Sequence, residues 1–238
     1  MTQKKHLPQV SRRNLLLFGA GAIGTGLVTT ALPKQLNAAP PATTSKNNLT
    51  PDEALQTLIE GNKRFVETRR KNPNQDIARV TEVAEGQNPF ACILGCSDSR
   101  VPTEIIFDQG IGDLFVVRLA GNIATTEDIA SQEYGTAVLG AKVVMVLGHK
   151  RCGAVKAALD NKPLPGFISS LVNAIRPAVK LTEGQSGDPL TNAIKENVKI
   201  QVEKVKQSQL ISELIKEGKL KVVGGYYDLD TGAVSLIV

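Results

Sequence analysis

Histidine is scarce in this chain, and tryptophan is absent. The two histidines among its 238 residues are His6 and His149. Because His6 falls in a leader-like segment, residues 1–38, any site in the rest of the chain can draw on His149 alone. If His149 is itself committed as a ligand, no histidine is left there to carry protons.

The chain after residue 38 also lacks a net charge. The first 38 residues hold five of the 28 basic side chains (Lys4, Lys5, Arg12, Arg13 and Lys34) and none of the 23 acidic ones. The remainder is therefore formally neutral, and the overall pI of about 9.1 describes the leader. The usual electrostatic argument for binding nucleic acid fails, so we expect no nucleic-acid partner.

A long hydrophobic run is missing too. The apolar stretch that ends at Ala31 carries four glycines and spans fewer than about 20 residues, so it is a weak membrane span. The preceding run Ser11-Arg12-Arg13-Asn14-Leu15-Leu16 resembles a twin-arginine signal peptide. We therefore predict that residues 1–38 direct export to the periplasm or another extracytoplasmic compartment. The alternative is an uncleaved leader that anchors the protein to the membrane.

Residues 39–48 are rich in Pro, Thr, Ser and Asn and indicate a linker, which leaves 49–238 as one domain. The order Thr50-Pro51-Asp52-Glu53 is a helix start with a capping box. Helical patterns follow at about 127–139, 153–159, 168–181 and 191–217, and strand-like runs occur near Phe90, Leu114, Val143 and Leu220. This alternation predicts an α/β fold with a mostly parallel central sheet flanked by helices. Residues 232–238 are expected to add an edge strand.

The residues with the potential for metal binding and catalysis lie in two short motifs. Each motif follows an apolar run that is typical of a buried strand. Cys96-Ser97-Asp98-Ser99-Arg100 follows the run 90–95, and His149-Lys150-Arg151-Cys152 follows the run 143–148. Open α/β sheets bind ligands beyond the carboxyl ends of their strands, so the two loops can meet there. Two thiolates and one imidazole suit zinc and leave a fourth tetrahedral position open for chemistry.

Other interpretations of these residues are weaker. A purely structural zinc site usually has closely paired ligands such as CxxC, and it would not explain Asp98 and Arg100 beside the first ligand. A disulfide between Cys96 and Cys152 would leave His149 and the same Asp-Arg pair unexplained. Cys92 shares the strand parity of Cys96, but free cysteine is so often buried that we predict a core position for it.

CSDSR followed by HxxCG resembles the zinc signature of the β-class carbonic anhydrases. The resemblance extends over roughly 49–238 and implies the fold of that family. It also implies one Zn²⁺ per subunit bound by Cys96, His149 and Cys152, with carbon dioxide and bicarbonate as substrate and product. Asp98 and Arg100 match a pair that works in the family as a gate, in which the carboxylate sits on zinc in the closed form and on arginine in the open form.

The same resemblance assigns roles to four further residues. Gln87, nine residues before Cys96, matches a glutamine that donates an amide hydrogen bond to a substrate oxygen. Phe115, Ala120 and Tyr134 match positions that build an apolar wall for CO₂, partly from the neighbouring subunit. The resemblance therefore implies at least a homodimer.

The ligand set implies a mechanism. Zinc lowers the pKa of a bound water to about 7, which supplies hydroxide near neutral pH to attack the carbon of CO₂. Asp98 is expected to accept a hydrogen bond from that hydroxide or to occupy the fourth position itself, and the rigid fork of Arg100 can hold it away from the metal.

Two alternatives of different kinds remain open at this stage. The same scaffold and ligands can hydrolyse carbon disulfide or carbonyl sulfide, and the chain could instead be a non-catalytic, zinc-stabilised assembly protein. One departure from some bacterial members is also visible. These carry a regulatory bicarbonate pocket with a tryptophan three residues before the first zinc cysteine, where this chain has Ile93, although Arg118 matches the arginine of that pocket.

The lack of a spare histidine generates a prediction about turnover. The product proton has to leave through water, buffer, or a group such as Asp98 or Tyr134. We expect the turnover of CO₂ hydration to rise markedly with buffer concentration. Stopped-flow rates measured at saturating CO₂ over a buffer series test this, and turnover that does not depend on buffer would contradict it.

Overall fold

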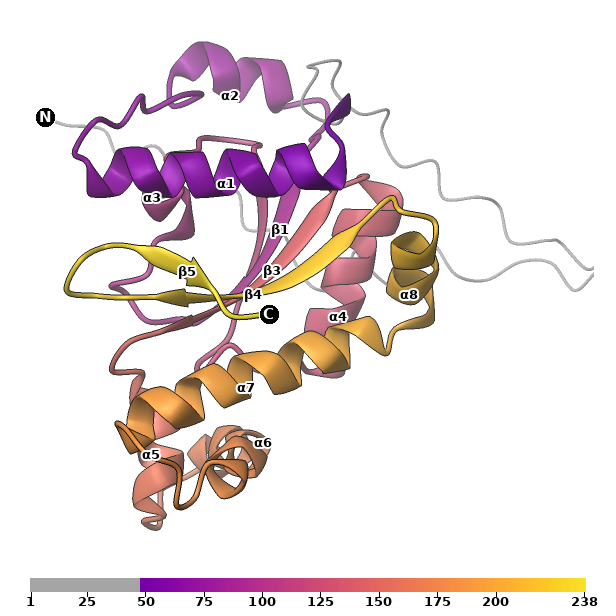
Figure 1. Cartoon of the computed structure of the whole chain (residues 1–238). Coiled ribbons are helices and arrows are strands. Elements are labelled where there is room, and N and C mark those ends of the chain that lie inside the picture. Colours follow the sequence, from indigo (N-terminus) through magenta and orange to yellow (C-terminus); the bar gives the residue numbers. More distant parts are fainter. Residues whose placement is uncertain (1–47) are drawn as a thin grey trace, which may run out of the picture. The chain divides into compact units, whose positions relative to one another are not determined.

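A five-stranded sheet organises residues 48–238, the part of the chain that the computed structural model describes. The predicted signal segment, and all of the predicted linker except residue 48, lie outside the described residues. The strands are β1 (Ala91–Gly95), β2 (Leu114–Arg118), β3 (Val143–His149), β4 (Lys221–Tyr227) and β5 (Val234–Leu236). They lie in the order β2-β1-β3-β4-β5 (Figure 1), and all neighbours are parallel except β4 and β5.

Helices connect these strands. Three precede β2 in the chain: α1 (Pro51–Val66), α2 (Ile77–Val83) and the short α3 (Thr103–Ile106). Between β2 and β3 lie α4 (Thr126–Glu133) and the π-helical turn η3 (Tyr134–Val138). Between β3 and β4 lie α5 (Gly153–Asp160), α6 (Ile168–Leu181), α7 (Pro189–Lys206) and α8 (Gln209–Lys216). Among residues 48–238, no helix combines the length and apolar character that a membrane crossing requires.

The two faces of the sheet pack against different helices. Alternate residues of a strand point to opposite faces, so Ile93 of β1 packs in one cluster with Leu58 of α1, and Leu94 packs in another with Val202 of α7. Figure 1 shows α1 and α7 on opposite sides of the sheet. Because both faces are covered, every residue of β1 and β3 is buried. The predicted α/β fold with a mostly parallel sheet is confirmed.

The start of α1 follows the predicted capping box. The Thr50 hydroxyl accepts the Glu53 N–H at 3.3 Å, and the Glu53 carboxylate accepts the Thr50 N–H at 2.7 Å. Together these bonds satisfy two of the backbone donors that a helix start leaves open.

Two expectations about helices need correction. The single helix expected over 191–217 is two helices, because the helical conformation is interrupted at Gln207 and Ser208. Ser208 caps α8 by accepting the Ile211 N–H on its hydroxyl at 3.2 Å, which is a start signal inside a continuous apolar pattern. The helices α2 and α3 were not predicted, since both are too short to show a full helical period.

Candidate metal centre

The first two candidate ligands lie at the ends of two neighbouring strands. Cys96 directly follows β1, and His149 is the last residue of β3. Parallel pairing places Gly95 opposite Leu147, so the carboxyl ends of both strands finish at the same edge of the sheet. The loop after His149 then turns back, and Cys152 forms the N-cap of α5. Its sulfur therefore lies next to the N-terminus of a helix.

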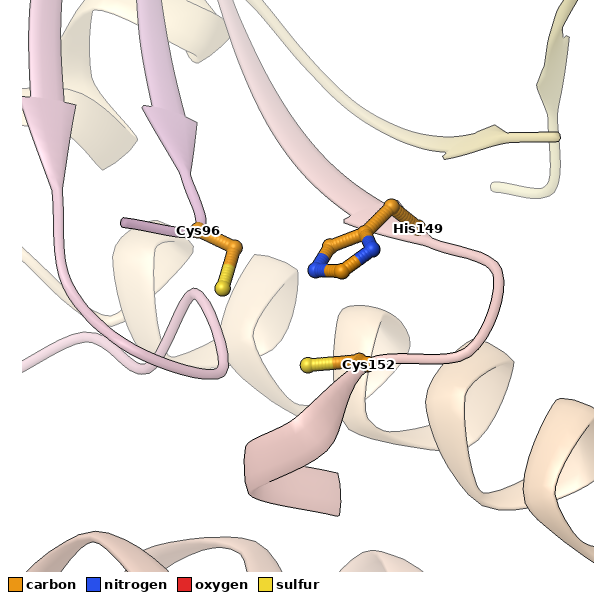
Figure 2. Close-up of side chains that lie close together, drawn as sticks. All are labelled: Cys96, His149 and Cys152. Atoms are coloured by element: carbon orange, nitrogen blue, oxygen red, sulfur yellow. The ribbon is translucent and has the colours of Figure 1, made fainter. Parts of the chain in front are cut away.

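The three side chains converge in a buried group. Their candidate ligand atoms all lie within 4.8 Å of one another, and Figure 2 shows both sulfurs and the imidazole pointing toward a common centre. That spacing suits one tetrahedral ion with bonds of about 2.0–2.3 Å to nitrogen and sulfur. His149 is 0% exposed, and its Nε2 has no hydrogen-bond partner. A buried nitrogen that lacks a partner and faces two sulfurs is the observation that a zinc ion would explain.

The second nitrogen of His149 has a partner that orients the ring. Its Nδ1 lies 3.0 Å from the Lys150 carbonyl oxygen. A carbonyl oxygen can only accept, so Nδ1 carries a hydrogen and donates a hydrogen bond to this oxygen. In a neutral imidazole the lone pair then falls on Nε2, which faces the sulfurs. The local backbone thus selects the tautomer that a metal requires.

Hydrogen bonding favours negative charge on one of the two sulfurs. Contact with the Cys152 thiol, followed by His149 and by the Gly121 N–H at 3.2 Å, outweighs burial and lowers the pKa of Cys96 to about 4. The same contact with Cys96, reinforced by burial, raises the pKa of Cys152. A metal held by both cysteines as thiolates would therefore release the remaining proton from this pair.

Asp98 and Arg100 form a bidentate pair beside this group. Arg100 donates from Nε to Asp98 Oδ1 at 2.8 Å and from Nη2 to Oδ2 at 2.7 Å. The guanidinium holds the pKa of the Asp98 carboxyl well below its usual range, so the carboxylate is ionised at neutral pH. Asp98 Oδ2 lies 3.8 Å from His149 Nε2, which puts the carboxylate next to the candidate metal position.

Arg118 holds the first ligand loop from the neighbouring strand. It donates from Nε to the Cys96 carbonyl at 2.9 Å and from Nη2 to the Asp98 carbonyl at 2.6 Å. From the sequence alone, Arg118 was connected only with the regulatory pocket of some relatives. These contacts show that it fixes the backbone between a candidate metal ligand and the Asp98 carboxylate.

The second ligand loop is fastened to the turn after β4. The Lys150 N–H donates to the Tyr227 carbonyl at 2.9 Å, and Lys150 Nζ lies 3.1 Å from Asp228 and 2.7 Å from Asp230. Arg151, in the left-handed region at φ 55°, also pairs with Asp230. The sequence does not predict this ion network, because its partners are 78 or more residues apart in the chain.

The remaining predicted site residues fall into two places. Ala120 lies in the loop after β2, next to Gly121 and so at the metal end of the sheet. Gln87 and Tyr134 line a separate pocket with Leu139, and the Tyr134 ring lies 6.2 Å from that of Phe115. Gln87 precedes β1 whereas Cys96 follows it, so the length of β1 separates this pocket from the metal centre of the same subunit.

Cys92 lies in the core, as predicted. It is 0% exposed among apolar side chains, and burial raises the pKa of its thiol. It does not belong to the group that could hold a metal.

Comparisons with known proteins agree with this geometry. Residues 91–234 match the family model described as carbonic anhydrase. Carbonic anhydrase 2 of Mycobacterium tuberculosis is 41% identical over 194 residues, covering 79% of this chain and 94% of that protein. The carbonic anhydrase of Mycolicibacterium smegmatis is 37% identical over the same shares of both chains.

Solved structures give the same result. The β-carbonic anhydrase CafA of Aspergillus fumigatus has a TM-score of 0.63 at 31% identity, over 66% of this chain and 79% of that one. A tetrameric β-carbonic anhydrase of Sordaria macrospora has a TM-score of 0.62 at 27% identity, over 66% and 85%. The chain therefore belongs to the carbonic anhydrase family, and within it to the β class. Zinc is the cofactor of that class, and Cys96, His149 and Cys152 could hold it.

The ligand assignment predicts how zinc binding responds to single cysteine changes. We expect the full chain to bind one zinc ion and Cys92→Ala to bind it equally well. Cys96→Ser and Cys152→Ser should each weaken binding by more than the roughly 10- to 100-fold typical when a residue that supports a ligand is lost. Metal analysis combined with chelator competition measures this. Loss of zinc from Cys92→Ala alone would contradict the assignment.

Proposed function

We propose that this protein catalyses the reversible hydration of carbon dioxide to bicarbonate and a proton at a zinc ion held by Cys96, His149 and Cys152. The observation that carries the proposal is the buried Cys₂His group with an ionised aspartate beside it, in a chain of the carbonic anhydrase family. Zinc bound there would supply hydroxide from water near neutral pH. The similar proteins described above are named as carbonic anhydrases, which gives no support to the sulfur-substrate or assembly-protein alternatives.

Asp98 is proposed to orient the nucleophile. An ionised carboxylate can only accept hydrogen bonds, so it favours a hydroxyl group that donates to it over groups that cannot. The Arg100 fork occupies both carboxylate oxygens and leaves Oδ2 near His149 Nε2. This arrangement corresponds to the open form of the proposed gate, in which arginine holds the carboxylate and would leave the fourth position at a bound metal free for substrate chemistry.

The pH dependence of this pair can be stated with its sign. Pairing with Arg100 depresses the pKa of Asp98 in the folded protein. The ion pair therefore stabilises the fold at pH values above the ordinary aspartate pKa of about 3.9, and this stabilisation is lost as the pH falls through the depressed pKa. Asp98 therefore keeps its charge throughout the neutral range. A change of catalytic rate near pH 7 has to come from a different group.

The pocket at Gln87 supports a homo-oligomer. Gln87 is exposed and cannot reach the metal centre of its own subunit across β1, and Tyr134 beside it is 45% exposed. We propose that Gln87, Phe115 and Tyr134 of one subunit complete the substrate pocket of another, with Ala120 contributed by the subunit that holds the metal. The similar β-carbonic anhydrase of Sordaria macrospora is tetrameric, so the partner is proposed to be at least a second copy of the chain.

Export by the twin-arginine-like leader is likewise proposed. The Ser11-Arg12-Arg13 run supports it. A buried thiolate site also fits a route that carries folded proteins, because cysteines already bound to zinc are less available for oxidation outside the cytoplasm.

The activity itself is the first prediction. Stopped-flow CO₂ hydration with a pH indicator should show fast turnover by the zinc-loaded full chain and essentially none by Cys152→Ser. We expect Asp98→Ala to reduce kcat/KM by roughly 10- to 100-fold, because the nucleophile loses its acceptor. Asp160→Asn, which removes another ion-paired aspartate, is the matched control and should behave like wild type. No hydration by zinc-replete protein between about pH 7 and pH 9 would contradict the proposed activity.

The proposed sharing of residues between subunits makes a second prediction. Gln87→Ala alone should be slow, because the proposed amide donor is gone, and Cys152→Ser alone should be inactive. A mixed dimer of the two variants contains one centre with intact ligands next to an intact Gln87 from the other subunit. Co-expression should therefore restore a substantial part of the activity. Mixed dimers with no more activity than the Gln87→Ala variant would contradict the shared site.

A further inference from the structure

The loop after β2 carries a hydrogen bond to a candidate metal ligand. Gly121 lies in this loop, and its N–H donates to Cys96 Sγ at 3.2 Å. Gly121 has a φ of +78°, and a Cβ added there would lie 2.6 Å from Ile175 Cδ1 and 3.2 Å from Ala154 Cβ. The position therefore requires glycine, and α5 and α6 close off the space around it.

Two amide side chains of α7 hold this loop from the other side. Asn197 donates from Nδ2 to the Gly121 carbonyl at 2.8 Å. Gln201, one helical turn later, donates from Nε2 to Asn197 Oδ1 at 3.0 Å and accepts the Ala124 N–H on Oε1 at 2.9 Å. The result is a closed chain of hydrogen bonds that begins and ends on the backbone of residues 121–124.

The ends of this chain fix its direction. A backbone N–H can only donate and a carbonyl can only accept, so Gln201 has to present oxygen to Ala124 and Asn197 has to present nitrogen to Gly121. The remaining oxygen of Asn197 and nitrogen of Gln201 then match each other. Rotating either amide by 180° would place a donor against a donor or an acceptor against an acceptor. The two amides therefore hold the loop in a single position.

The two amides of this chain of hydrogen bonds are fully buried. Asn197 and Gln201 are both 0% exposed, and they share α7 with the buried Val198 and Val202. Burying two amides costs free energy that only well-formed hydrogen bonds offset. Apart from the bond that joins the two amides, their hydrogen bonds run to the loop that contacts Cys96.

We propose that Asn197 and Gln201 are positioning residues of the metal centre, which hold the Gly121 N–H on the Cys96 sulfur. A hydrogen bond to a thiolate draws charge from the sulfur and sets how strongly it donates to a metal. The two amides therefore act on the metal through the loop, although neither touches it. This inference rests on the proposed zinc site, since Cys96 must be a ligand for it to hold.

The test compares metal binding by full-length variants. Asn197→Ala removes the donor to Gly121, and Gln201→Met keeps the volume of the side chain while removing both of its hydrogen bonds. We expect each to weaken zinc binding by about 10- to 100-fold in chelator competition. In the cobalt-substituted protein, each should shift the thiolate-to-metal absorption band. Asn192→Ala, which removes an α7 asparagine that bonds only the Ser186 carbonyl, is the matched control and should change neither.

A double variant tests whether the two amides act as one chain. If Gln201 works through Asn197, the loss in zinc affinity for the double variant should be well below the product of the two single losses. Independent effects would multiply, and that outcome would overturn the linked arrangement.

Other outcomes separate this proposal from its competitors. Wild-type zinc affinity and an unchanged cobalt band in both single variants, with only a lower Tm, would overturn it in favour of a purely structural role. Failure of both to fold under conditions where Asn192→Ala folds would also contradict it, because the chain would then be needed for the fold itself. If the wild type binds zinc but does not hydrate CO₂, the proposed activity fails while the affinity comparison still decides this inference.

Discussion

The in-register parallel pairing of β1 with β3 is the constraint on which the metal centre depends. It pairs Gly95, the last residue of β1, with Leu147, so that Cys96 and His149 follow close together at one edge of the sheet. Side chains alternate along a strand, and a slip of one residue would turn the imidazole to the opposite face. The buried residues of both strands resist such a slip, because each face packs against its own helices. Core packing and ligand geometry are therefore set by the same register.

Burial of the ligand group imposes a second requirement, which the surrounding loops meet. Buried polar atoms and charges need partners, and here the backbone supplies many of them. The Lys150 carbonyl orients the imidazole, the Gly121 N–H contacts one sulfur, and Arg118 binds the carbonyls of Cys96 and Asp98. The conformations of three loops thus bear on a single centre. This explains why a short signature such as CSDSR works only within a much larger structure.

The sequence predicted the three candidate ligands that the structure brings together, but only part of what supports them. Cys96, His149 and Cys152 carry distinctive chemistry, and the apolar runs before the first two placed them at strand ends. The ion network of Lys150 and Asp230 could not be predicted, because pairing between exposed charges far apart in the chain leaves no local pattern. The amides of α7, in contrast, do leave a signal in the sequence. They occupy positions on the apolar stripe that continues through Val198 and Val202, where a polar residue indicates a buried partner.

Similar reasoning explains the errors in the helices and the part of the site that the sequence left open. The apolar pattern over 191–217 continues through Ser208, so periodicity alone could not reveal that its hydroxyl starts a new helix. The resemblance implied that part of the substrate pocket comes from a neighbouring subunit, but the sequence does not say which copy of the chain contributes which residue. Only the position of Gln87 before β1 and of Cys96 after it separates the two places.

The attachment of the second ligand loop to the turn after β4 has a consequence for folding. His149 pairs with Tyr227, and Lys150 and Arg151 bind acidic residues at 228 and 230, so contacts about 80 residues away fix the backbone around two ligands. Closing so long a loop is slow compared with forming local helices. During synthesis the segment 143–152 leaves the ribosome well before residues 221–230. The backbone around His149 and Cys152 is therefore fixed only after residues 221–230 have joined the sheet beside β3.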